Sequence, residues 1–157
     1  MDNSIVKIDL DTTNILHRSK KFEQEFELAL FDLLEKNRFE LQGYESVPGP
    51  YIMKIALKSE RLAFSIFKED GKLIKDIFLA LKPFRTLIKD YFLICESYFN
   101  AIEYMTSSQI EAIDIGRRGL HNEGAQLLTE RLEKDVEMDK QTARRLFTLL
   151  CALQVRG

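Results

Sequence analysis

The hydrophobic pattern of this chain changes at Lys82-Pro83 from mainly strand-like to wholly helical. Before the proline, apart from one helical stretch over residues 19–38, apolar residues alternate with polar ones as in half-buried β-strands. After the proline they recur every three or four residues, as in amphipathic helices. We therefore predict an α+β fold, with a sheet and one helix in residues 1–82 and packed helices in residues 83–157.

The first predicted strand covers residues 5–11, because Val6, Ile8 and Leu10 alternate there with charged residues. The helix that follows begins after Ser19, which can cap it, and its apolar residues have helical spacing. We expect the apolar side of this helix to lie on the sheet.

Three more strands are predicted after a loop over residues 41–50. This loop holds two glycines and two prolines, a composition that hints at a mobile lid. One strand at 51–58 turns near residues 59–61 into the next, and Asp70-Gly71 suits a tight hairpin turn into the last, at 73–81. The expected result is a small antiparallel sheet in the chain order strand, helix, strand, strand, strand.

Three helices are predicted in the second half. The first carries an unbroken apolar stripe through residues 84–105, which indicates a core-facing side; a homodimer seam is the alternative, although the repeat lasts only about three heptads. The second covers residues 108–133, with Ser108 and Glu111 spaced as a capping box. Asp139 is placed to cap the third.

Length and charge favour a single globular domain over residues 1–157. The chain is 45% apolar and 31% charged with a formal net charge of −2, which does not favour a nucleic-acid partner. No stretch reaches the roughly 18 uncharged apolar residues of a membrane span, and the N-terminus lacks a secretory pattern, so we expect a cytoplasmic protein without a membrane partner. Cys95 and Cys151 lack metal or redox spacing; we predict neither a metal nor a cofactor, and two reduced, buried thiols.

The second predicted helix carries the candidate binding residues. Asp114, Arg118 and His121 follow one another at spacings of four and three, with Arg117 beside them, so their side chains can converge. Two guanidiniums and an imidazole suit a phosphate or carboxylate. The anion-binding set predicted from this pattern is Arg117, Arg118, His121, Asn122 and, from the last helix, Arg144, whereas Arg145 is expected to face away.

Other interpretations of this stretch stay open. His121 could act as a general acid or base with Asp114 or Glu123, which would make the protein a small enzyme. Alternatively, the carboxylates neutralise the arginines and His121 bonds a carbonyl group at the edge of the core. The sequence therefore favours a binding module for a small anion or a protein partner, and names neither.

Three glycines interrupt the same helix at positions 116, 119 and 124. A glycine inside a helix costs about 1 kcal/mol relative to alanine, so three in nine residues call for another reason. A neighbouring helix could cross closely, a ligand could approach the backbone, or the helix could break near Gly119.

Several runs of the second half resemble an uncharacterised protein family of alphaproteobacteria. They lie at residues 83–85, 89–92, 94–98, 108–114, 116–124 and 142–149, and include Gly116-Arg117-Arg118-Gly119-Leu120-His121-Asn122-Glu123-Gly124. The resemblance covers nearly the whole chain and is most specific over residues 83–149. It implies a bacterial protein and no particular activity.

Overall fold

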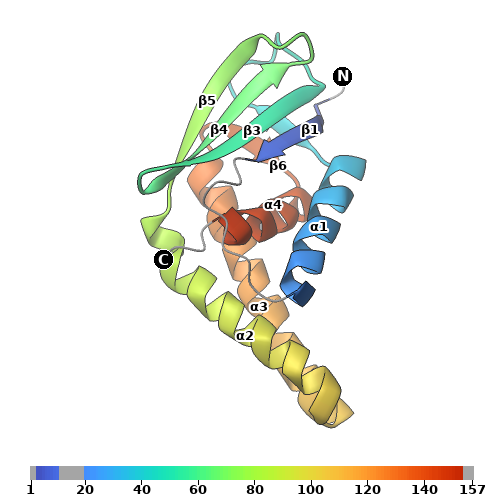
Figure 1. Ribbon diagram of the computed structural model, residues 1–157. Helices are drawn as coiled ribbons and strands as arrows, with labels where there is room; N and C mark the ends of the chain where they lie inside the picture. Colours follow the sequence, from blue (N-terminus) through green and yellow to red (C-terminus); the bar gives the residue numbers. More distant parts are fainter. Residues whose placement is uncertain (1–2, 11–19, 154–157) are drawn as a thin grey trace.

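The computed structural model describes residues 3–10 and 20–153 (Figure 1). Its elements, in chain order, are β1 (Ile5–Leu10), α1 (Lys20–Glu35), β2 (Phe39–Leu41), β3 (Tyr51–Lys58), β4 (Arg61–Lys68), β5 (Leu73–Ala80), the 3-10 turn η2 (Lys82–Phe84), α2 (Arg85–Tyr104), α3 (Ser107–Leu132), β6 (Val136–Met138) and α4 (Lys140–Leu153). This is an α+β fold, and the change from strands to helices falls at Lys82-Pro83 as predicted.

Four strands form the main sheet, in the spatial order β1-β3-β4-β5. Strands β3, β4 and β5 form the predicted antiparallel meander, with Gly71 at a φ of 91° in its second turn. Strand β1 pairs parallel to β3, so the sheet is mixed and not wholly antiparallel as expected. Helix α1 lies between β1 and β3 in the chain, and β3 runs in the same direction as β1. A connection that includes a helix is usual between parallel strands.

The ladder between β1 and β3 shifts register between Ile5 and Lys7. Ile5 is fully buried, whereas Val6 is 45% exposed and Ile8 and Leu10 are only partly buried against the core. The prediction that Val6 lies on the buried side is therefore wrong. One irregular residue in a strand moves its neighbours to the opposite face, and the alternation of the sequence does not reveal it.

A second, two-stranded sheet joins distant parts of the chain, and the sequence did not predict it. β2 pairs antiparallel with β6, so that Phe39 lies opposite Met138 and Leu41 opposite Val136. These four side chains are buried. Three residues are too few to show a period, so neither strand can be recognised before its partner is known.

Helix α4 is the innermost helix, with α1 and α3 packed on it (Figure 1). Every residue over positions 146–152 is buried. At its start, the Asp139 carboxylate accepts a hydrogen bond from the Thr142 backbone N–H at 2.9 Å, which confirms Asp139 as the predicted cap.

Helix α1 packs mainly against α4 and meets the main sheet at β1. The residue that joins them is Asn37, just after the helix. Its Oδ1 accepts from the Ile5 N–H at 2.7 Å, and its Nδ2 donates to the carbonyl oxygens of Ile5 at 2.8 Å and Leu33 at 2.7 Å. The predicted helix–sheet contact thus exists chiefly at an edge strand; the predicted cap, Ser19, lies outside the described residues.

Helix α3 is continuous through Gly116, Gly119 and Gly124, so it does not break. A Cβ at Gly116 would lie 2.8 Å from Ile94 Cδ1 of α2, and one at Gly124 would overlap the Phe147 ring of α4. At Gly119 a Cβ would meet nothing within 4 Å. Two of the three glycines therefore lie where a neighbouring helix packs closely.

The N-terminus of α3 is capped two residues earlier than predicted. Thr106 Oγ1 accepts from the Gln109 N–H at 3.4 Å, and Gln109 Oε1 accepts from the Thr106 N–H at 3.1 Å. This is a reciprocal capping box. The expected pair of Ser108 and Glu111 has the same spacing but lies inside the helix.

Within the described ranges, no helix is both long and apolar enough to cross a bilayer. Nor do residues 3–10 and 20–153 contain a group of three or more His, Cys, Asp or Glu side chains placed to hold a metal ion. Cys95 and Cys151 are free and buried, as predicted.

Candidate functional site

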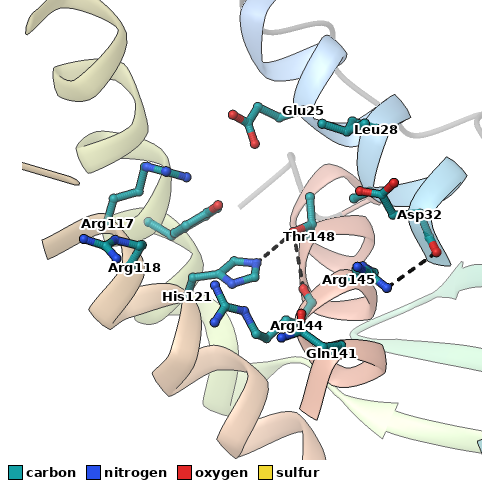
Figure 2. A pocket seen from close by; sticks show the side chains of 12 residues that line it. Glu25, Leu28, Asp32, Arg117, Arg118, His121, Gln141, Arg144, Arg145 and Thr148 are labelled. Carbon is teal, nitrogen blue, oxygen red and sulfur yellow. Dashed lines mark hydrogen bonds between the residues drawn. The ribbon is translucent and has the colours of Figure 1, made fainter. Parts of the chain in front are cut away.

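Side chains from all four helices line a polar pocket of about 240 Å³. Figure 2 shows α3 on one side, α1 on the other and α4 between them. The lining residues are Glu25, Leu28, Ala29, Asp32, Tyr91, Arg117, Arg118, His121, Gln141, Arg144, Arg145 and Thr148. Four arginines face two carboxylates, so the lining carries an excess of positive charge; we call it the arginine pocket.

On α3, Asp114 is shared between two arginines. Its Oδ1 accepts from Nε and Nη2 of Arg117 at 3.1 and 2.7 Å, and its Oδ2 lies 3.2 Å from Nε of Arg118. The Arg117 guanidinium also stacks over the Tyr98 ring, 4.6 Å from its centroid. One carboxylate cannot neutralise two guanidiniums, so this side of the arginine pocket stays positive.

Asp114 therefore meets Arg117 and Arg118, as the sequence predicts. His121, the other member of the predicted flank, contacts Thr148 instead. Burial alone would lower the pKa of Arg117, but its hydrogen bonds to Asp114, together with the fields of Tyr91 and Asp114, outweigh this and raise it. Arg117 therefore stays charged, and Asp114 holds it in place on the α3 side of the arginine pocket. Arg118 is 55% exposed at its side chain and has more freedom to meet a ligand.

The His121 side chain extends from α3 toward α4 (Figure 2). Its Nε2 is 2.9 Å from Thr148 Oγ1, and the Thr148 hydroxyl donates to the Arg144 carbonyl oxygen at 3.3 Å. Because a hydroxyl has one hydrogen, Nε2 then donates to Thr148 and the neutral ring keeps a lone pair on Nδ1. Nδ1 is buried and has no hydrogen-bond partner among the described residues.

The imidazole of His121 is neutral at physiological pH. Burial, together with the positive charges of Arg144 and Arg117, lowers its pKa to about 4, and the Arg144 carbonyl group opposes this shift only in part. The ring also contacts two aromatic rings, with centroids 5.4 Å from Tyr91 and 5.7 Å from Phe147. His121 therefore contributes an uncharged ring, held against Tyr91 and Phe147, to the lining of the arginine pocket.

On α4, two consecutive arginines reach the pocket in different ways. Arg145 donates from Nη1 to the carbonyl oxygens of Asp32 at 3.5 Å and Lys36 at 3.4 Å, at the C-terminal end of α1. A cation is favourable at this end of a helix. Figure 2 shows the Arg144 side chain extending toward His121, and no described carboxylate forms an ion pair with it.

The expectation that Arg145 faces away is wrong, because it rested on α4 alone. Arg145 points at α1, whose position the sequence did not supply. The same holds for Glu25 and Asp32 of α1, which line the arginine pocket and were missed. Thr148 was also missed, although it lies one turn after Arg144 and its spacing could have indicated the contact.

Two predicted site residues do not share the arginine pocket. Asn122 lines a separate hollow with Ala125 and Lys140. Glu123 lines a groove with Asp90 on the side of α3 that faces α2. Successive residues on a helix point about 100° apart. Asn122 and Glu123, which follow His121 in the sequence, therefore point to other sides of α3. Neither Asp114 nor Glu123 is bonded to His121 among the described contacts.

Comparison with known proteins identifies the relatives of this chain. The model of the Uncharacterised protein family (UPF0262) matches residues 2–156. The UPF0262 protein of Rhodospirillum rubrum is 49% identical over 98% of this chain and 93% of its own length. Those of Jannaschia sp. and Paracoccus denitrificans are 50% and 49% identical, over 95% and 96% of this chain and 96% and 95% of their own lengths.

No solved structure matches the chain. The relatives come from alphaproteobacteria, as the resemblance implied, and the family description names no activity. The match spans nearly every residue, including all four helices that line the arginine pocket. The chain belongs to the UPF0262 family of uncharacterised bacterial proteins.

Proposed function

We propose that this protein is a cytoplasmic, non-enzymatic binding module that holds a small organic anion, with phosphate or carboxylate groups, in the arginine pocket. The proposal rests on the surroundings of Arg144. Arg144 lines the pocket without an ion pair to any described carboxylate, and faces a wall that already holds two guanidiniums on one aspartate.

The arginines divide into two roles. Arg117 and Arg145 are held by Asp114 and by the end of α1, and they set the shape and the field of the pocket. Arg118 and Arg144 keep donors for a ligand. A hydrogen bond between a charged pair stabilises by about 1.5–3 kcal/mol when it is partly removed from water. Two such residues together supply about 3–6 kcal/mol, which corresponds to a Kd between millimolar and tens of micromolar.

The size of the pocket limits the ligand. A water molecule takes up about 30 Å³ in the liquid, so a volume of about 240 Å³ suits a small phosphorylated or carboxylated molecule and not a dinucleotide. The neutral His121 ring adds a polar, uncharged surface at the same place.

The acid–base alternative gains no support from this geometry. Asp114 is engaged by Arg117 and Arg118, Glu123 lies on another side of α3, and His121 is bonded to a hydroxyl group. We therefore argue binding and not catalysis.

The proposal is tested by thermal shift and calorimetry with inorganic phosphate, glycerol 3-phosphate and citrate. A ligand that binds the native state alone raises the free energy of unfolding by RT ln(1 + [L]/Kd), so we expect at least one of the three to raise the Tm at millimolar concentration. Arg144→Gln and Arg118→Gln should each weaken binding about tenfold, the loss of roughly one charged hydrogen bond.

Arg131→Gln is the matched control, because Arg131 is an exposed arginine of α3 outside the pocket. It should bind as the wild type does. The proposal fails if none of the three anions binds at millimolar concentration, or if Arg144→Gln and Arg131→Gln have equal affinities.

A further inference from the structure

One wall of the arginine pocket is acidic. Glu25 of α1 lines the pocket, and Figure 2 shows its side chain extending from α1 toward the side where α3 lies. Glu25 is partly buried. Its carboxylate forms no hydrogen bond or ion pair with any residue of the described ranges. A charge that is partly removed from water without a partner costs free energy, so a ligand with a positive group would be favoured here.

The field of Glu25 reaches across the pocket to Arg117. Burial is the largest influence on the pKa of Arg117 and lowers it, the hydrogen bond with Asp114 raises it, and Glu25 makes a smaller contribution that also raises it. The two charges thus act on each other without forming an ion pair. Asp32, two turns further along α1, lies instead beside Arg145, whose Nη1 donates to the Asp32 carbonyl oxygen at 3.5 Å.

The charges around the pocket define the charge of a matching ligand. Four arginines line the pocket, and three carboxylates lie in or beside it, namely Glu25, Asp32 and Asp114. One positive charge is left over. A ligand with two negative charges and one ammonium group would balance it, and would also give Glu25 a partner.

We infer that the ligand is a zwitterionic acid, whose anionic group meets Arg118 and Arg144 and whose primary ammonium group meets Glu25. The inference rests on the proposed function and narrows its ligand from small anions in general to acids that carry an amine. An ammonium group has three donors for a carboxylate. Leu28 and Ala29, one turn along α1 from Glu25, also line the pocket and offer an apolar surface to the carbon chain of the ligand.

Ligands with charge of one sign fit this lining less well. A simple anion satisfies the arginines, but it brings a like charge toward Glu25, which costs free energy. A simple cation satisfies Glu25 and meets the unpaired guanidinium of Arg144. An acid with an amine is the class of ligand that suits both walls.

The test compares two pairs of compounds by calorimetry with the full chain: L-glutamate with glutarate, and phosphoethanolamine with ethyl phosphate. The second compound of each pair lacks the ammonium group and is more negative by one charge, so net charge alone would favour it in a positive pocket. We expect the amine to bind about tenfold more tightly in at least one pair, the gain of roughly one charged hydrogen bond. Glu25→Gln should remove this preference without weakening the compound that lacks the amine.

Glu27→Gln is the matched control, because Glu27 is an exposed glutamate of α1 outside the pocket and the change in charge is the same. It should keep the preference, and circular dichroism should show that both variants are folded. The inference is overturned if neither pair shows a preference for the amine, or if Glu25→Gln and Glu27→Gln behave alike. Binding of glutarate or ethyl phosphate that Arg144→Gln weakens, without any preference for the amines, would overturn this inference and uphold the proposed function.

Discussion

His121 is the side chain in which burial, charge and hydrogen bonding of the arginine pocket meet. Its pKa is lowered to about 4 because the ring is buried beside Arg144 and Arg117. A histidine in an unfolded chain has a pKa of about 6.5. Between these two values the unfolded chain binds more protons than the native one, so the free energy of unfolding rises with pH.

We therefore expect the stability that depends on neutral His121 to be present above about pH 6.5 and to be lost as the pH falls toward 4. The loss amounts to at most about 2 to 3 kcal/mol, from about 1.4 kcal/mol per pKa unit, and less where water screens the ring. Urea unfolding at pH 7 and pH 4.5 measures it. His121→Gln keeps an amide for Thr148 and should lose less stability over this interval; an identical pH slope in both proteins would show that His121 is not buried neutral.

For single residues, the sequence shows which side chains lie close together only if those side chains belong to the same helix. Arg117, Arg118 and His121 were found because their spacing is helical. Arg145 was assigned to the wrong side, because its direction depends on α1 packing on α4. Residues on different elements meet in one site through tertiary packing, and the spacing of residues within one helix carries no information about that packing.

Helix α3 passes between two neighbours, and its glycines mark how closely each approaches. Gly124 lies against the Phe147 ring, which is fully buried, and Gly119 faces open space. An alanine at either position gains about 1 kcal/mol of helix propensity. At Gly124 the added methyl group must also displace an aromatic ring of the core, and overpacking of this kind costs about 1–3 kcal/mol.

We expect Gly124→Ala to lower the free energy of unfolding and Gly119→Ala to raise it by up to about 1 kcal/mol. Urea denaturation of the two variants beside the wild type is the measurement. The two substitutions make the same chemical change in the same helix, so a difference in sign isolates the packing contribution. Equal effects would mean that Phe147 gives way without cost.

The elements themselves were largely predictable from local patterns. Asp139 was found as a cap from its place before an apolar run, whereas the cap of α3 was placed on Ser108 and Glu111 when Thr106 and Gln109 form it. Both pairs have the spacing of a capping box, so the pattern alone cannot choose between them. The choice depends on where α2 ends and how the chain turns into α3.

For the molecule as a whole, the two cysteines report on the integrity of the core. Cys95 lies on α2 and Cys151 on α4, and both are buried. Burial raises the pKa of Cys95 to about 11, although its hydrogen bond with Tyr91 and the charge of Arg117 oppose the shift, and raises that of Cys151 well above its usual value. The thiolate is the reactive form, so both groups should be inert in the native state.

We expect a colorimetric disulfide reagent to leave both thiols unmodified at neutral pH in the native protein, and to label both in denaturing urea. At intermediate urea concentrations the labelling should follow the unfolding transition seen by circular dichroism, because each thiol is exposed only when the helices separate. Rapid labelling of either thiol without urea would contradict the packing of α2 and α4.

The sequence by itself determined the α+β class, the meander of β3, β4 and β5, and the three helices after Lys82-Pro83. These features follow from hydrophobic period, turn residues and proline, which act over a few neighbouring residues. Tertiary structure alone decided the rest: the parallel pairing of β1, the small sheet of β2 and β6, and the enclosure of the arginine pocket by α1. Each joins segments far apart in the chain, and long-range packing has no signature in local order.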